Sequence, residues 1–125
     1  MVIEEVQRNA AKDTRAGVRL EVVDNASENW PAVAQWIERS GQAARLLDED
    51  GWLSARQIVV AAFVGQKVVG HLGYRVSPVR SGNKIVLEAR IDSQHVSKSG
   101  VEQLLFDRAQ AHARLLGCRT LRREY

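Results

Sequence analysis

IVVAAFVGQKVVGHLGYRV, residues 58–76, is the stretch that decides the fold. Residues 58–64 and 68–76 are rich in β-branched side chains, and a short turn that contains Gly65 separates them. Two such runs around a glycine turn predict a β-hairpin. Pro78 and the polar residues that follow it are expected to end the second strand.

On either side of the hairpin, the spacing of apolar residues alternates between the periods of strands and helices. Before the hairpin we expect a strand over 18–23 (VRLEVV), a helix that begins at 27–31 and stops at Gly41, and a short helix over 42–47. After it we expect a strand over 84–92 (KIVLEARID), a polar loop over 93–100, a helix over 101–116 and a short strand over 118–122. This order predicts an α/β (α+β) fold with a mixed sheet, in which antiparallel strands lie at the centre and a strand–helix–strand unit adds a parallel pair.

The 125 residues suffice for one domain with its own core. Residues 1–17 show no clear period and are expected to form an N-terminal arm, which leaves 18–125 as the folded domain. The apolar fraction of 45% and the charged fraction of 26% are typical of a soluble globular protein. They exclude collagen-like and low-complexity architectures.

No apolar run is long enough to span a bilayer, and the N-terminal residues are too polar for a secretory signal peptide. We therefore expect a cytoplasmic protein that makes no membrane contact. A single cysteine, Cys118, excludes an internal disulfide, and its place at the start of a strand predicts a core position. The spacing of His, Cys, Asp and Glu suggests no metal site, so no metal is expected.

Charge is distributed unevenly along the chain. Residues 1–50 hold six Lys/Arg against ten Asp/Glu, whereas residues 51–125 hold twelve against five. A half with this excess attracts anions, such as a phosphorylated cofactor, an acidic partner or nucleic acid. The arginines near the C-terminus have few aromatic neighbours on which bases could stack, so nucleic acid is the least favoured of these partners.

The hairpin, the strand KIVLEARID and the segment SKSGVEQLLFDRAQAHARLLGCRTLR (97–122) together resemble the GNAT N-acetyltransferase superfamily, over about residues 18–123. The hairpin is similar to the family's second and third strands, and KIVLEARID to its fourth. The segment 97–122 is similar to the family's acetyl-CoA loop, third helix and fifth strand. The resemblance implies a GNAT-like mixed sheet, here without the usual C-terminal helix and last two strands. It also implies an acetyl-CoA-dependent N-acyltransferase that acetylates an amine of a small molecule or a protein.

In this family the acetyl-CoA loop has the pattern Gln/Arg-x-x-Gly-x-Gly/Ala, and its backbone N–H groups hold the pyrophosphate at a helix N-terminus. The matching register here is 97–102, which keeps Gly100 but has Ser97 and Glu102 at the other signature positions. A second register, with 97–99 in the place of Gly-Lys-Gly, fits the helix length less well. The resemblance assigns two groups of cofactor-binding residues: Lys98, Ser99, Gly100 and Val101 for the pyrophosphate, and the backbone of Ile91 and Asp92 for the pantetheine arm.

Acetyl transfer needs a group that removes a proton from the attacking amine. Glu88 lies in the middle of a strand on its polar face, near where family members often place a base, and is the candidate catalytic residue. The alternative is a structural ion pair across the strands with Arg75 or with the neighbours of Arg90. Family members often use a tyrosine to protonate the leaving thiolate, and Tyr125 could take this role by position.

Three other side chains have both a structural and a functional interpretation. His71, in the second strand of the hairpin, is expected to face solvent, and the alternative is a catalytic role through water. His112 is expected at the edge of the core. Trp36 lies off the apolar stripe of its helix and could mark a binding surface.

A second functional hypothesis is a catalytically inactive GNAT-like module that acts in protein–protein interaction. An open sheet edge is a template for strand pairing, so a homodimer, or a partner protein that covers the edge, is expected under both hypotheses. An enzyme would bind acetyl-CoA, whereas a module would not.

Overall fold

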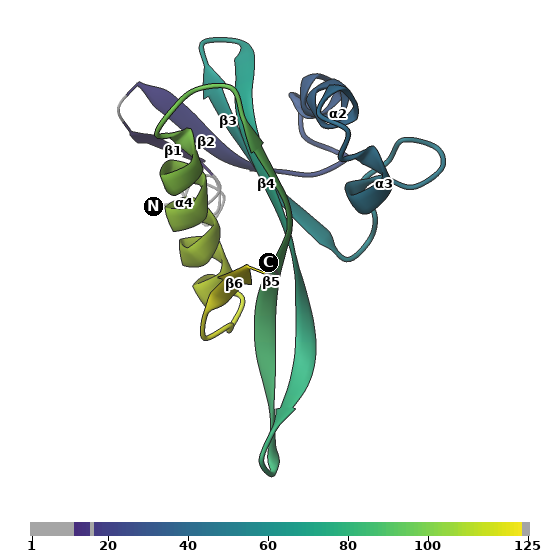
Figure 1. The fold of residues 1–125 in the computed structure, drawn as a ribbon, viewed down its shortest axis with the longest axis vertical. Helices are drawn as coiled ribbons and strands as arrows, with labels where there is room; N and C mark the ends of the chain where they lie inside the picture. Colours follow the sequence, from purple (N-terminus) through teal and green to yellow (C-terminus); the bar gives the residue numbers. More distant parts are fainter. Residues whose placement is uncertain (1–11, 16, 124–125) are drawn as a thin grey trace, which may run out of the picture.

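The computed structural model describes residues 12–15 and 17–123, which form one six-stranded sheet with helices on both faces (Figure 1). The strands are β1 (Lys12–Arg15), β2 (Val18–Val23), β3 (Gln57–Val64), β4 (Lys67–Ser81), β5 (Lys84–Val96) and β6 (Leu121–Arg123). The helices are α2 (Trp30–Arg39), α3 (Ala43–Leu46) and α4 (Val101–Leu115). The strands are antiparallel from β1 to β5, and β6 is parallel to β5. The predicted mixed sheet is confirmed.

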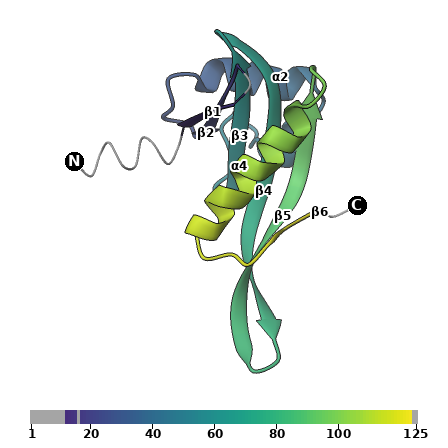
Figure 2. The same cartoon turned by 90° about the vertical axis from the view of Figure 1, so that its left-hand side faces the viewer.

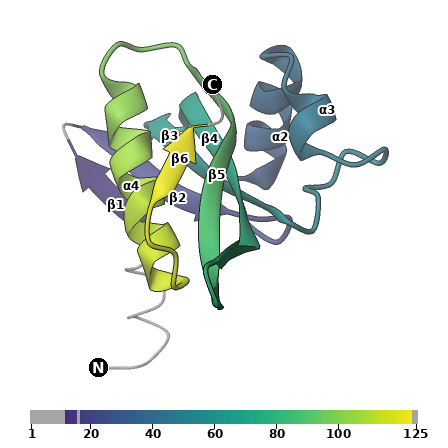
Figure 3. The same ribbon diagram turned by 60° about the horizontal axis from the view of Figure 1, so that its bottom comes forward.

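The helices divide the core into two layers, because α4 covers one face of the sheet while α2 and α3 cover the other (Figure 3). On the α4 face, Leu105 and Ala109 are fully buried in a cluster that includes Leu72 of β4. On the other face, Val33 and Ile37 of α2 are buried with residues of β3. Full burial of a side chain of this size contributes about 1.5–3 kcal/mol. The apolar spacing that predicted these two helices therefore marks their buried sides.

The second strand of the hairpin is longer than predicted. β4 continues through Pro78, and a tight turn at Gly82 (φ +63°) leads into β5. β3 stops pairing with β4 at Gln57 and Arg75, so no described strand lies on that edge of β4 further on. Proline has no N–H to donate, but it loses no ladder hydrogen bond at such an edge. The prediction that Pro78 ends the strand is therefore wrong, and the β4–β5 hairpin projects beyond the helices (Figure 2).

Part of the predicted N-terminal arm belongs to the sheet. Residues 12–15 form β1 and pair with residues 18–21 of β2. Residues 1–11 and 124–125 lie outside the described part of the chain, and with them lies Tyr125, the candidate for protonating a thiolate.

Helix α3 approaches the sheet closely because Gly73 of β4 has no side chain. A Cβ atom added at Gly73 would lie 2.6 Å from Cδ2 of Leu46, which is fully buried. Since α3 has only four residues, its position depends on this contact more than on its own helical hydrogen bonds. Leu46 therefore also fixes its neighbour Arg45 near the sheet.

We expect Gly73→Ala to lower the free energy of unfolding by about 1–3 kcal/mol, because the added methyl group overlaps with the buried Leu46 side chain. Urea denaturation followed by circular dichroism measures the difference. Ser81→Ala, at the exposed end of the same strand, is the control and should change this free energy by less than about 0.5 kcal/mol. Equal effects of the two substitutions would contradict the close packing at Gly73.

Candidate functional site

A β-bulge at Asp92 interrupts the ladder between β4 and β5. Ile91 lies opposite Tyr74 and Ser93 lies opposite Gly73, so Asp92 is an extra residue in β5. A bulge bends the strand and changes the direction of the side chains that follow it. The strand continues beyond the bulge, and the prediction of a loop from Ser93 onward is wrong because the side-chain alternation changes phase there.

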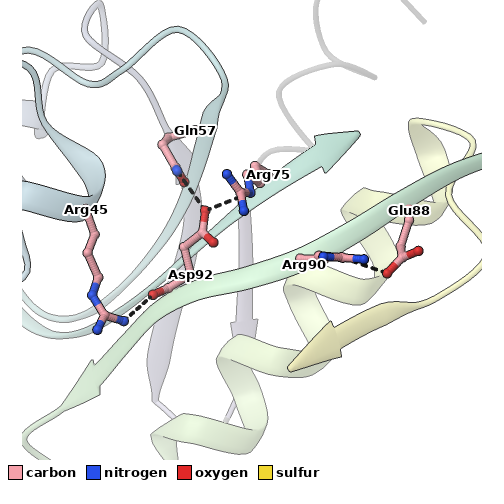
Figure 4. Close-up of polar contacts among 6 residues, drawn as sticks. All are labelled: Arg45, Gln57, Arg75, Glu88, Arg90 and Asp92. Carbon is pink, nitrogen blue, oxygen red and sulfur yellow. Dashed lines mark hydrogen bonds and ion pairs between the residues drawn. The ribbon is translucent and has the colours of Figure 1, made fainter. Parts of the chain in front are cut away.

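Three side chains from three different elements converge on Asp92 (Figure 4). Nη1 of Arg45 donates a hydrogen bond to the backbone carbonyl of Asp92 at 3.1 Å. Nε2 of Gln57 donates to Oδ2 of the same residue at 2.8 Å, and Nε of Arg75 lies 3.6 Å from that oxygen. The four residues line a cavity of about 350 Å³. Helix α3 and strands β3, β4 and β5 thus meet at the bulge.

Glu88 precedes Asp92 in β5 and is held by two arginines. Its Oε1 accepts hydrogen bonds from Nε of Arg90 at 2.9 Å and from Nη1 of Arg122 at 3.3 Å. The hydrogen bond from Arg90 is the main reason why the pKa of Glu88 lies below its ordinary value. These three residues and Arg123 line a second cavity of about 270 Å³. The ion pair considered as the alternative is therefore present, although its partners are Arg90 and Arg122 and not Arg75.

Three arginines lie side by side across the sheet. Arg75 of β4 is opposite Arg90 of β5, and Arg90 is opposite Arg122 of β6. Residues that are directly opposite share a face, and like charges in this arrangement destabilise a sheet. Asp92 offsets the charge at Arg75, and Glu88 offsets the other two. We refer to Arg75, Arg90 and Arg122 as the arginine row.

The loop before α4 leads into a helix N-terminus with features of an anion site. Gly100, the N-cap, has φ +88° and provides no side-chain cap for the N–H groups of the first turn. Lys98 and Ser99 are exposed, whereas the Val101 side chain is buried and its backbone N–H donates a hydrogen bond to the Lys98 carbonyl at 3.3 Å. Glu102 is exposed in the first turn, where the helix dipole stabilises its charge.

Between the bulge and this loop, one edge of β5 has no described neighbour. β6 pairs with β5 at residues 89–91, and no described strand pairs with 92–96 on that side. An extended backbone with an open edge can form strand-like hydrogen bonds to a ligand. The bulge and the α4 N-terminus therefore lie at the two ends of one open edge.

No family model and no curated protein sequence matches this chain, but solved structures match its fold. A ribosomal-protein-alanine N-acetyltransferase from Brucella melitensis biovar Abortus 2308 matches with a TM-score of 0.67 at 15% identity, over 85% of this chain and 78% of that one. An aminoglycoside acetyltransferase from an uncultured soil metagenomic sample, in complex with sisomicin, matches with a TM-score of 0.65 at 14% identity. The match covers 87% of this chain and 78% of that one. A GNAT family acetyltransferase from Staphylococcus aureus matches with 0.58 at 11%, over 87% of each chain. This chain has the GNAT fold.

Within the GNAT fold, the predicted site residues are distributed along β5 and the loop that follows it. Ile91 is buried, and its position opposite Arg123 places it in the last pair of the β5–β6 ladder. The Asp92 carbonyl is already bonded to Arg45. Glu88 lies about 13 Å from Asp92 along the strand. The structure thus brings Asp92 near the open edge and places Glu88 beside β6, and the catalytic role of Glu88 stays a prediction.

His71 is fully buried, so the prediction that it faces solvent is wrong. Nε1 of Trp36 donates a hydrogen bond to Nδ1 of His71 at 2.9 Å, which assigns the ring proton to Nε2. Nε2 then donates to Oγ of Ser93 at 2.7 Å. Burial, with a smaller contribution from His95, lowers the pKa of His71 to about 4. The neutral His71 ring links Trp36 of α2 to Ser93, which follows the bulge. The indole N–H of Trp36 is therefore engaged within the protein.

Between pH 7 and pH 5, we expect the wild type to lose about 2 kcal/mol more of its free energy of unfolding than His71→Asn. The unfolded histidine takes up a proton near pH 6.5, whereas the folded one does so only near pH 4, so acid in this window favours the unfolded state. Asparagine can still accept a hydrogen bond and does not titrate. Urea denaturation at several pH values gives both curves, and parallel pH dependences would rule out a neutral buried His71.

His112 and Cys118 occupy the structural positions predicted for them. His112 is half-buried at the edge of the core, where its Nδ1 and the Tyr74 hydroxyl share a hydrogen bond of 2.6 Å. Burial raises the pKa of the Tyr74 hydroxyl and lowers the pKa of the His112 ring, which keeps both groups neutral at pH 7. Cys118 is buried in the α4 layer of the core.

Sequence reasoning missed Arg45 and Gln57, and it considered Arg75 only as a partner of Glu88 and not of Asp92. The hairpin register is the signal that could have found the last two, but the β3–β4 ladder shifts by one residue next to Ala62. Continued without this shift, the pairing at the turn would place Gln57 opposite Tyr74 instead of Arg75. For Arg45, the path of the chain through α3 would have to be known.

None of the helices in residues 12–15 and 17–123 is long and apolar enough to cross a bilayer. In the same part of the chain, no three His, Cys, Asp or Glu side chains gather as metal ligands would.

Proposed function

We propose that this chain is an acetyl-CoA-dependent N-acetyltransferase that transfers the acetyl group to an amine of a small molecule or a protein. The observation that carries the proposal is the open edge of β5, which runs from Asp92 to the N-terminus of α4. An open strand edge can pair with the amides of the pantetheine arm, and a helix N-terminus favours the pyrophosphate. The acetyltransferases that share the fold support the same function.

Under this proposal, the backbone of Ile91 and Asp92 and the loop Lys98–Val101 hold acetyl-CoA. A left-handed Gly100 followed by helical residues is the backbone pattern of an anion nest, and a bound phosphate would have to replace the Lys98 carbonyl as the acceptor for the Val101 N–H. Lys98 adds a positive charge. Glu102 acts against these groups because its carboxylate repels the phosphates, so we expect weaker coenzyme binding than in a loop with glycine there.

The acceptor amine attacks the thioester carbonyl carbon, the carbon–sulfur bond breaks, and coenzyme A leaves as the thiolate. The proton that the amine loses goes to Glu88 through water molecules, because Glu88 lies about 13 Å from Asp92 along β5. Because Arg90 and Arg122 hold the pKa of Glu88 below its ordinary value, this carboxylate is ionised at neutral pH and is a weak base. Asp92 is the second carboxylate of this region and competes for the same role.

Acetyl-CoA at about a hundred times its Kd should stabilise the protein by about 2.7 kcal/mol, which raises the Tm by several degrees. Differential scanning fluorimetry with acetyl-CoA, desulfo-CoA and ATP measures the shift. Both coenzymes should stabilise the protein and ATP should not, because ATP has no pantetheine arm to pair with β5. Glu102→Gln should enlarge the shift because it removes the opposing charge. An unchanged Tm at millimolar acetyl-CoA would refute the proposed function.

Glu88→Gln and Asp92→Asn are matched variants that separate the two carboxylates. If Glu88 accepts the proton, Glu88→Gln lowers kcat by about 100-fold or more without changing the Kd for acetyl-CoA. Asp92→Asn keeps an oxygen that can accept the hydrogen bond from Gln57 and should lower kcat by less than about tenfold. Release of the coenzyme thiol in the presence of acceptor amines measures both rates. The opposite order of effects would assign the base to Asp92.

A second candidate function is a catalytically inactive module that acts through protein–protein contact or as a homodimer. The observation that favours it is a set of exposed apolar side chains on β5 and at the end of α4, namely Ile85 (73% exposed), Leu87 (38%), Leu115 (70%) and Leu116 (43%). Leu87 lies next to Gly117, so the strand and the end of the helix adjoin there. For such a module, acetyl-CoA would leave the Tm unchanged and sedimentation velocity would show an oligomer.

A further inference from the structure

We infer that the acceptor is an amine that also carries an anionic group, either a carboxylate or a phosphate, and that the arginine row binds this group. The inference rests on the proposed function, because it takes the row as the acceptor side of an acetyltransferase site. Three features carry it: the charge of the two cavities beside the row, the exposure of the guanidinium groups, and the position of the row relative to the bulge.

The two cavities are positively charged and adjacent. Among residues 12–15 and 17–123, five arginines and two carboxylates line them. Arg75 lines the cavity at Asp92 and Arg90 lines the cavity at Glu88, and these two arginines lie directly opposite each other on neighbouring strands. A ligand in either cavity therefore lies beside the row and within the same positive field.

The guanidinium groups of the row are accessible to a ligand although they contact carboxylates. The exposed fraction of the side chain is 44% for Arg75, 41% for Arg90 and 65% for Arg122. A guanidinium has five N–H donors in a planar fork, so an exposed one can keep its existing contacts and still bind an anion from the solvent side. Charge-assisted, bidentate pairs of this kind favour carboxylates and phosphates.

The row also lies where an acceptor has to lie. Arg90 precedes the bulge residue Asp92 by two positions, or about 7 Å along the strand. The thioester of a coenzyme that pairs with the open edge of β5 would lie beside this bulge. An acceptor anchored on the row by its anionic group can therefore direct its amine at the thioester.

Other charged ligands fit this surface less well. An aminoglycoside carries several ammonium groups, which the five arginines would repel. A nucleic acid needs a long basic track with aromatic side chains for stacking, whereas the row spans three strands, or about 10 Å, and none of the described residues that line the two cavities is aromatic. A small anionic amine matches both the size and the charge of the site.

The test compares acceptors that differ only in the anionic group, with acetyl-CoA binding measured first on the same preparation. The panel contains free amino acids and their amides, a phosphorylated amine and its alcohol, an aminoglycoside and a neutral amine. Release of the coenzyme thiol gives kcat/KM for each. We expect kcat/KM for each anionic amine to exceed that for its neutral partner by about tenfold or more. Arg122→Gln should bring this ratio close to one. Arg114→Gln, on the exposed side of α4, makes the same charge change away from the row and should preserve the ratio.

The ratio separates anion binding from an indirect effect through Glu88. Loss of the contact between Arg122 and Glu88 would change the rates of the anionic amine and its neutral partner equally, whereas loss of an anion contact lowers only the first. Acetyl-CoA binding with equal or better transfer to neutral or polycationic amines would overturn the inference and leave the proposed function standing. Salt-sensitive binding of an oligonucleotide that Arg122→Gln weakens would overturn it as well. Failure to bind acetyl-CoA would overturn both.

Discussion

The extra residue at Asp92 is the constraint on which the rest of the site depends. Before it, the alternation of β5 directs Ile91 into the α4 layer of the core. After it, Ser93 faces the α2 side, where its hydroxyl meets the buried ring of His71. If residues 91–93 all paired with β4 in regular alternation, without a bulge, Ser93 would lie on the α4 side with Ile91, and His71 would lose the acceptor for its Nε2 proton. The bulge thus sets both the buried network under α2 and the exposed cluster around Asp92.

The packing that stabilises the domain also positions its polar side chains. The α4 layer packs mainly through apolar side chains. On the other face, α3 is too short to be stable alone, and Leu46 holds it over Gly73. Arg45 precedes Leu46 and reaches the Asp92 carbonyl. The close approach at one glycine therefore brings a charge from the acidic first half of the sequence to the bulge.

The apolar spacing within a segment predicts those helices and strands that depend on that segment alone. The strand over 18–23 and the helices α2 and α4 lie close to their expected bounds, because each depends on an apolar period within its own residues. The cluster of side chains around Asp92 depends on two register shifts, next to Ala62 and next to Gly73. Neither shift can be recognised from the residue types in the sequence. The ion pair of Glu88 could be anticipated as a type of contact. Its partners could not, because Arg122 reaches it only through the placement of β6.

The arginines that would attract an anionic acceptor also weaken the base that would serve it. Glu88 contacts Arg90 and Arg122 of the row, and the hydrogen bond from Arg90 lowers the pKa of Glu88. An anion bound to the row would compete for the same guanidinium groups, so that less of their charge would stabilise the ionised carboxylate of Glu88. The carboxylate would then have a higher pKa and be a stronger base when an acceptor is present than when the site is empty. An anionic acceptor would in this way improve proton removal at the moment when it is needed, which a neutral amine at the same place would not do.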